Sequence, residues 1–350
     1  MNTGDAPVPL IIVGGFLGAG KTSFVNHLLA GAAGRRLAVL VNDFGEINID
    51  AKLIAYQTDR VVSLTNGCIC CDFGDNIYQT VFRMLDVDPP LDGMVIETSG
   101  VADPAKLAIL GRVGKFLRLN AMVIVVDAAH IQSHARDRYF ADTILRQIAT
   151  AELLVINKCD LATADEVAAI EAWLKPIAPN AATLRTAGGV VPIEVVLGEG
   201  APGGQRDNAE APESRHDHNH EGYAPHRNVF SSWSFTARQP FIAAKLRDAV
   251  RSLPPAIVRG KGIVWLDEAL ERQTIFNLVG RRLEFTDGAS WGAAPPRTEV
   301  VFIAARGEAN FAPVEVLLTG AFTPMSPSQL KGAHPRKDLP SAEGGSSVCG

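Results

Sequence analysis

Short apolar runs alternate with longer amphipathic stretches over the first two hundred residues of the chain. The apolar runs have the length of strands and read LIIV, RLAVLV, RVVSL, GMVIE, AMVIVVD, LLVIN and ATLRT. A helical pattern lies between them at residues 21–29, 75–85, 104–111 and 165–174. Nearly continuous apolar strands separated by helices indicate a parallel sheet that is covered on both faces. The pattern therefore predicts a doubly wound α/β domain over residues 8–197.

The pattern breaks at residue 198. Residues 198–228 are polar, rich in Gly, Pro and His, and offer almost nothing to bury, so they predict a flexible linker. From 229 to 322 the strand-like run VFSSWSF and a helical stretch at 241–253 are followed by the strand-like runs KGIVWL, RRLEF and EVVFIA and by a helical stretch at 313–318, which predicts a smaller α+β domain. We expect the tail, 323–350, to be disordered, and its Cys349 is given no role.

Composition narrows the class of protein. Hydrophobic residues make up 47% and charged residues 20% of the 350 positions, which is typical of a globular protein with a substantial core. The net charge of −5 favours neither nucleic acid nor an anionic membrane as a partner. The N-terminus lacks the basic segment and long apolar run of an export signal. We therefore expect a cytoplasmic protein, whose thiols stay reduced.

A phosphate-binding loop follows the first apolar run. The segment GGFLGAGKT contains a full Walker A pattern between a strand and a helix, the context that supports the motif. Its backbone N–H groups would surround the β-phosphate, Lys21 would reach the β- and γ-phosphates, and Thr22 would bind Mg²⁺. The predicted nucleotide-binding residues here are Gly15, Gly18, Ala19, Gly20, Lys21, Thr22 and Ser23, with Lys21 also catalytic.

The segment LLVINKCD predicts the base that is recognised. Asn157, Lys158 and Asp160 end an apolar strand, at the edge where doubly wound folds bind ligands. A carboxylate at Asp160 can accept hydrogen bonds from N1–H and the 2-amino group of guanine, a donor pair that adenine lacks. The motif predicts GTP and GDP as ligands, although four residues alone could also be a surface turn.

Two further strands end in a carboxylate that could orient Mg²⁺, at Glu97 and at Asp127. Glu97 begins an E-x-x-G segment, and a backbone N–H at Gly100 could approach the γ-phosphate in a loop that moves when this phosphate leaves. We expect Glu97 on the magnesium side and both Glu97 and Gly100 in hydrolysis. We expect Asp127 to support the end of its strand.

Three of the five cysteines lie together at Cys68, Cys70 and Cys71. Three thiolates suit a transition metal such as Zn²⁺, Co²⁺ or Cu⁺ and leave one coordination position open. A redox pair and buried packing cysteines are the alternatives. Along an extended chain Cys68 and Cys70 would converge, with Cys71 joining only if the backbone turns.

Two other groups are candidate metal ligands. Asp43, Glu46 and Asp50 follow the second apolar run and could bind metal, position water or form a solvated turn. The linker contributes the histidines His216, His218, His220 and His226, which could bind zinc loosely or have no function. We expect Cys159 to face the guanine pocket or the core, and His27 to be structural.

The motifs GGFLGAGKT, NDFGEINID, TNGCICC, ETSG and NKCD, in this order, resemble the CobW-type metallochaperone GTPases, relatives of HypB and UreG. The resemblance spans residues 10–197, and a His-rich linker before a small C-terminal domain is also typical. It implies that GTP hydrolysis is coupled to delivery of a metal, commonly zinc and otherwise cobalt or iron, to a client protein. The three clustered cysteines match the metal motif of the family, and Glu97 matches its Walker B position.

The chain departs from this family at one position, because N-D-F-G-E stands where the family usually has N-E-F-G-E. Asp43 is one methylene shorter than Glu, which puts a direct metal or water contact there in question, whereas Glu46 and Asp50 fit. Related GTPases often act as dimers, so a homodimer stays open. A GTP-regulated zinc sensor or buffer without metal transfer is the second hypothesis, and a small-molecule kinase, disfavoured by N-K-x-D, is the third.

Overall fold

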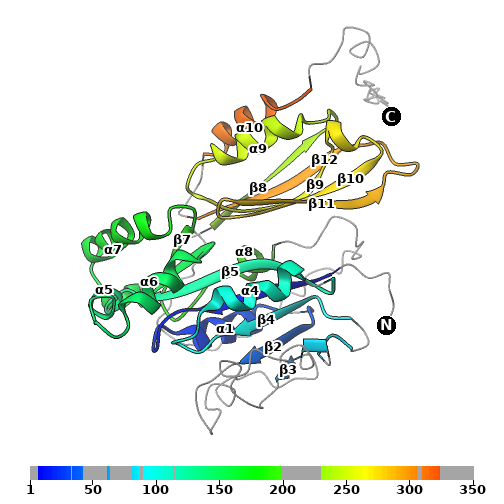
Figure 1. Cartoon of the computed structure of the whole chain (residues 1–350). Coiled ribbons are helices and arrows are strands. Elements are labelled where there is room, and N and C mark those ends of the chain that lie inside the picture. The colour runs from blue at the N-terminus through cyan, green and yellow to red at the C-terminus, as the bar shows by residue number, and fades with distance from the viewer. Residues whose placement is uncertain are drawn as a thin grey trace, which may run out of the picture.

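The computed structural model describes residues 7–32, 34–41, 61–63, 81–82, 84–86, 90–113, 115–198, 230–305 and 310–323. Within them it contains two sheets, one in each half of the chain, with helices on their faces (Figure 1). No helix in these ranges is long and apolar enough to cross a membrane.

The first sheet has seven parallel strands in the order β3-β2-β4-β1-β5-β6-β7. They are β1 (Val8–Gly14), β2 (Leu37–Val41), β3 (Val61–Ser63), β4 (Gly93–Glu97), β5 (Leu117–Asp127), β6 (Leu153–Asn157) and β7 (Ala182–Arg185). Every residue of β2, β4 and β6 is buried, as expected for strands that are covered on both faces. The doubly wound domain and each of its predicted strands are thereby confirmed.

Helices cover both faces of this sheet. They are α1 (Lys21–Ala30), α4 (Pro104–Val113), α5 (Ile131–His134), α6 (Ala141–Ala149), α7 (Ala164–Ile177) and α8 (Ile193–Leu197). Apolar residues of α1 and α8 pack on one face, and those of α4, α6 and α7 pack on the other. The helices predicted at 21–29, 104–111 and 165–174 are confirmed. The one predicted at 75–85 lies mostly outside the described residues, of which 81–82 and 84–85 are helical.

The second sheet is antiparallel, in the order β11-β10-β9-β12-β8. Its elements are β8 (Phe230–Ala237), α9 (Ala243–Arg251), β9 (Ile257–Val264), β10 (Arg272–Val279), β11 (Arg282–Ser290), β12 (Thr298–Ala305) and α10 (Ala312–Thr319). Helices α9 and α10 cover the face of this sheet that points away from the first domain (Figure 1). The small α+β domain is confirmed, and β10, whose first half is polar, is the strand that the sequence pattern did not show.

The other face of the second sheet packs against the first domain. Val258, Val279 and Ile303 of this sheet share one apolar core with Phe24 and Leu28 of α1. The two halves of the chain are therefore packed together as one structure and are not merely tethered. Apart from Gly198 and Thr323, the linker and the tail lie outside the described residues.

Candidate nucleotide site

Residues 15–20 form a tight loop between β1 and α1, and glycines are required in it. Gly15, Gly18 and Gly20 have φ angles of 136°, 73° and 95°, which side chains rarely permit. A Cβ on Gly15 would lie 2.1 Å from the carbonyl oxygen of Val125. The loop is thus pressed against the neighbouring strand β5 and leads directly into the N-terminus of α1, where the helix dipole favours an anion.

Thr22 and Glu97 meet at the carboxyl ends of β1 and β4. The Thr22 hydroxyl donates a 2.9 Å hydrogen bond to Glu97 Oε1. Glu97 is 1% exposed, and its strand pairs with β1 directly beneath the loop. A hydroxyl and a carboxylate are the oxygen donors that Mg²⁺ prefers, so the two residues fit the predicted magnesium position.

Lys21 and Gly100 also lie against this loop. Lys21 is buried, and its Nζ donates a 3.3 Å hydrogen bond to the carbonyl oxygen of Phe16, which holds the side chain over the loop. A Cβ on Gly100 would lie 2.7 Å from the backbone nitrogen of Leu17. The segment after β4 therefore approaches the phosphate loop as closely as a glycine allows.

Asn157 joins the phosphate loop to the loop that follows β7. Its Nδ2 donates to the carbonyl oxygen of Ala19 at 2.9 Å, and its Oδ1 accepts from the N–H of Gly189 at 2.9 Å. Lys158 has the left-handed φ of 61°, and Asp160 is exposed in the short turn that follows. Sequence positions 138 residues apart are thus brought together at one edge of the sheet, as the motifs predicted.

Asp127 has a larger part in this site than the sequence indicated. Its Oδ2 accepts a 2.8 Å hydrogen bond from Lys158 Nζ and lies 3.2 Å from His130 Nδ1. Burial raises the pKa of Asp127, but the hydrogen bonds from Lys158, from His130 and from the N–H of Ala129 outweigh it and hold the pKa below its ordinary value. The sequence showed only that this carboxylate ends its strand, and the structure adds that β5 and β6 are neighbours, with Asp127 paired in register with Asn157.

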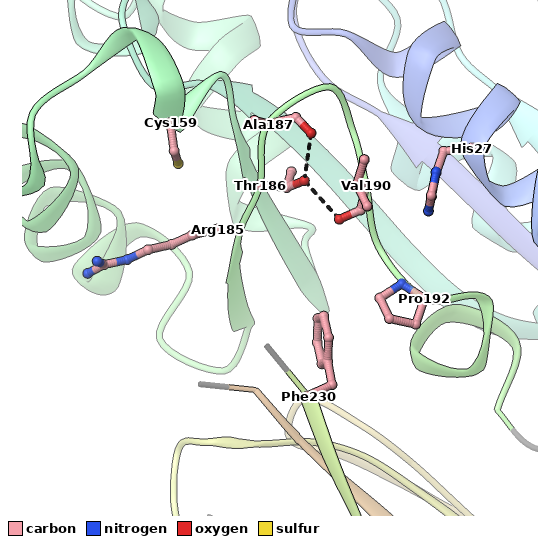
Figure 2. A pocket seen from close by; sticks show the side chains of 8 residues that line it. All are labelled: His27, Cys159, Arg185, Thr186, Ala187, Val190, Pro192 and Phe230. Carbon is pink, nitrogen blue, oxygen red and sulfur yellow. Dashed lines mark hydrogen bonds between the residues drawn. The ribbon is translucent and has the colours of Figure 1, made fainter. Parts of the chain in front are cut away.

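A pocket of about 280 Å³ lies beside the base-recognition segment (Figure 2). Its lining comes from α1, from the segments after β6 and β7, and from the start of β8: His27, Cys159, Arg185, Thr186, Ala187, Val190, Pro192 and Phe230. Burial raises the pKa of the Cys159 thiol, which donates to the carbonyl oxygen of Ile156 at 3.2 Å. Cys159 lines this pocket together with Thr186, Ala187 and Val190. No motif indicated the segment 186–190, whose Gly189 N–H donates to Asn157.

The residues predicted to bind a transition metal are those of the cysteine loop, the acidic turn and the linker. Cys68, Cys70, Cys71, Asp43, Glu46, Asp50, His216, His218 and His220 lie outside the described residues. Within the described ranges no group of three or more His, Cys, Asp or Glu side chains is arranged to hold a metal ion. Strand β3 runs parallel to β2 and ends at Ser63, so the chain leaves it at the edge that carries the phosphate loop, five residues before Cys68.

Two family models match the chain. The model described as the nucleotide-binding domain of CobW/HypB/UreG matches residues 9–185, and the one described as the C-terminal domain of the cobalamin synthesis protein cobW matches residues 230–315. Together the two matches cover the two domains that the structure shows.

The individual relatives share less than a third of their residues with this chain. Zinc-regulated GTPase metalloprotein activator 1 of Dictyostelium discoideum is 28% identical, over 82% of this chain and 69% of its own length. The zinc chaperone CobW of a Sinorhizobium species is 28% identical, over 85% and 92%. The crystal structure of the Zn(II)-bound YjiA GTPase from Escherichia coli aligns over 91% of this chain and 100% of its own, at 20% identity and a TM-score of 0.39.

Proposed function

The chain belongs to the CobW/HypB/UreG family of P-loop GTPases, and we propose that it is a metallochaperone that hydrolyses GTP to control transfer of zinc to a client protein. The observation that carries the nucleotide part of this proposal is the junction of three motifs at one sheet edge, where Asn157 binds the phosphate loop and Thr22 binds Glu97.

We propose that each residue at this edge binds one part of the nucleotide or its magnesium ion. The backbone of residues 15–20 would bind the β-phosphate, with Ser23 at the first turn of α1, and Lys21 would reach the β- and γ-phosphates. Thr22 and Glu97 would hold Mg²⁺, which neutralises charge on the phosphates when it is bound. Gly100 would place its N–H near the γ-phosphate, and Lys158 and Asp160 would bind the guanosine.

The metal part of the proposal rests on Cys68, Cys70 and Cys71. Cys68 is the fifth residue after Ser63 and Cys71 the eighth, so Cys68 follows within roughly 17 Å and Cys71 within roughly 28 Å of the end of β3. A metal held there would lie within reach of the segments that contact the γ-phosphate, so loss of this phosphate could change metal affinity. Linkage requires the reverse effect as well, in which bound metal changes nucleotide affinity. Asp43, Glu46 and the linker histidines are candidate additional ligands.

The remaining proposals concern organisation. We infer domain limits of 8–197 and 229–322, which enclose the two matched ranges, with 198–228 as linker and 323–350 as tail. Two curated relatives are named for zinc, which favours zinc over cobalt as the cargo. A cytoplasmic location, a client protein that binds the second domain, and a homodimer complete the proposal.

The deciding experiment is a zinc competition titration against a chromophoric chelator, with GDP and with a non-hydrolysable GTP analogue. We expect zinc affinity to differ at least tenfold between the two nucleotides, and Cys68→Ala/Cys70→Ala to abolish tight binding in both states. Zinc affinity that is tight but indifferent to nucleotide would instead indicate a buffer or a structural site. Turnover of GTP without zinc binding would leave the GTPase assignment intact and refute the cargo.

A further inference from the structure

Helix α6 carries a buried glutamine on its apolar face. Ile144, Gln147 and Ile148 are the buried residues of this helix, and their spacing in the sequence places them on one side of it. The two isoleucines belong to the apolar core that covers one face of the first sheet, and Gln147 is only 2% exposed. Burial of an amide costs free energy unless its polar atoms are hydrogen-bonded, so a glutamine at this position needs partners.

The partners of Gln147 are two carbonyl oxygens of the segment that follows β4. Its Nε2 donates to the carbonyl oxygen of Gly100 at 3.1 Å and to that of Ala102 at 2.7 Å. An amide nitrogen carries two hydrogens, and each has an acceptor here. The segment after β4 is therefore tied to a helix that follows more than 40 residues later in the chain.

The same segment contacts the phosphate loop. A Cβ on Gly100 would lie 2.5 Å from Leu17 Cδ2 and 2.7 Å from the backbone nitrogen of Leu17. At the start of the segment, the N–H of Thr98 donates to the carbonyl oxygen of Val13 in β1 at 2.9 Å. Residues 98–102 thus touch both the phosphate loop and α6, so they cannot move without changing one of these contacts.

Helix α6 is a suitable anchor because it is itself fixed against the phosphate loop. Phe140 directly precedes the helix, and its ring centroid lies 5.3 Å from that of Phe16 in the phosphate loop. At the other end, the Thr150 hydroxyl donates to the carbonyl oxygen of Gln147 at 2.7 Å, which closes the last turn. One helix therefore contacts the phosphate loop at its start and holds the segment after β4 near its end.

We propose that Gln147 is a positioning residue for GTP hydrolysis, an inference that rests on the proposed place of Gly100 at the γ-phosphate. The amide of Gln147 fixes the carbonyl of Gly100 and so limits the orientations of the backbone that carries the Gly100 N–H. GTP and its transition state would meet this N–H, whereas GDP has no γ-phosphate to do so. Loss of the two hydrogen bonds therefore affects GTP and its hydrolysis more than it affects GDP.

A glutamine with a purely structural role would give a different result. If its hydrogen bonds only stabilise the fold, their loss lowers the melting temperature and leaves the kinetics of the folded protein unchanged. If they position the segment after β4, kcat falls in protein that is fully folded. The ratio of GTP to GDP affinity falls with it, because only the triphosphate reaches this segment.

The test uses the full chain with Mg²⁺ at a temperature where every variant is folded. Steady-state GTP hydrolysis is measured first, and then the affinities for GDP and for a non-hydrolysable GTP analogue. Gln147→Met keeps the length of the side chain but donates no hydrogen bond. We expect kcat to fall about tenfold or more, the affinity for the analogue to fall roughly threefold or more, and GDP affinity to stay within about twofold. Gln147→Glu places acceptor oxygens against the same carbonyls, so it should lower kcat as well, and it keeps the test decisive if Gln147→Met does not fold.

Ile148→Val is the matched control, because it shortens the next buried side chain of the same helix and removes no hydrogen bond. It should lower the melting temperature and keep the kcat of the wild type. Unchanged kcat in both Gln147 variants, or an equal fall in Ile148→Val, would overturn the proposal.

Gly100→Ala, measured alongside, separates the two ways of failing. If Gly100→Ala slows hydrolysis while both Gln147 variants act as the wild type does, the role of Gln147 alone is refuted. If Gly100→Ala also hydrolyses GTP normally, the proposed place of Gly100 fails, and the role of Gln147 fails with it.

Discussion

At the scale of single residues, the ion pair between Asp127 and Lys158 positions the lysine of the base-recognition segment. Asp127→Asn keeps the size of the side chain but removes its charge, so Lys158 loses a charge-assisted hydrogen bond of 2.8 Å. We expect GDP affinity to fall roughly three- to tenfold, equivalent to about 1 kcal/mol. Asp248→Asn, which removes an exposed pair on α9, is the control and should leave affinity unchanged. Titration with fluorescent GDP measures the affinity of both variants. Equal GDP affinities for Asp127→Asn and the wild type would show that the position of Lys158 does not depend on this ion pair.

Asp127 also predicts a pH dependence. Because its pKa is lower in the folded chain than in the unfolded chain, its contribution to stability is present above the unfolded value of about 3.9 and is lost as pH falls through the folded value. The wild type should therefore lose its stability advantage over Asp127→Asn between about pH 5 and pH 2. Urea denaturation at several pH values measures this, and a difference that does not depend on pH would contradict it.

Lys261 leads to a prediction about stability at alkaline pH. Its folded pKa of about 8 lies below its ordinary value of 10.5, so between these values the unfolded chain binds more protons and stability rises with pH. In phosphate-free buffer with reductant, the wild type should gain on the order of 1–3 kcal/mol relative to Lys261→Met between pH 8 and pH 10.5. Parallel stability curves for the two proteins would mean that neither burial nor the neighbouring cations disfavour the charged form of Lys261.

At the scale of elements, the close packing of the segment after β4 on the phosphate loop can be disturbed by one methyl group. In Gly100→Ala the new Cβ would lie within 2.5–2.7 Å of Leu17, so one of the two loops must shift. We expect the rate of GTP hydrolysis to fall at least tenfold with a smaller effect on GDP affinity, since GDP lacks the γ-phosphate. Gly320→Ala, where the nearest atom to the new Cβ is 3.4 Å away, is the matched control and should hydrolyse GTP normally. Comparable rates of GTP hydrolysis for Gly100→Ala and Gly320→Ala would show that Gly100 has no part in hydrolysis.

An element could be predicted from the sequence when the residues that cause it lie close together in the chain. The strand β1, the glycine loop and the helix α1 are encoded within 23 consecutive residues, 8–30, and the strands β1 and β2 are apolar along their length because both faces of the sheet are covered. The polar first half of β10 and the support that residues 186–190 give to Asn157 depend on partners distant in sequence. No local sequence pattern indicates such contacts, and no local pattern indicates that Arg259 is buried.

At the scale of the whole molecule, Arg259 couples the two domains. It is buried against Asn120 of β5 and Leu197 of α8, and the apolar core continues across the same junction. Binding of GDP to the first domain should therefore also stabilise the second. Three of the four tryptophans, Trp233, Trp265 and Trp291, lie in the second domain, so intrinsic fluorescence reports mainly on its unfolding.

This coupling gives a direct measurement. At GDP concentrations near 100 times the dissociation constant, linkage adds about 2.7 kcal/mol to the stability of whatever unfolds together with the nucleotide site. In the wild type the fluorescence-detected urea midpoint should rise accordingly. Arg259→Ala leaves Asn120 Oδ1 without its donor and opens a cavity, so it should cost about 2–4 kcal/mol and largely abolish the GDP-induced rise. Arg251→Ala, at an exposed position of α9, should keep the rise. If the midpoint of Arg259→Ala still responds to GDP as the wild type does, the shared apolar core alone is sufficient to couple the domains.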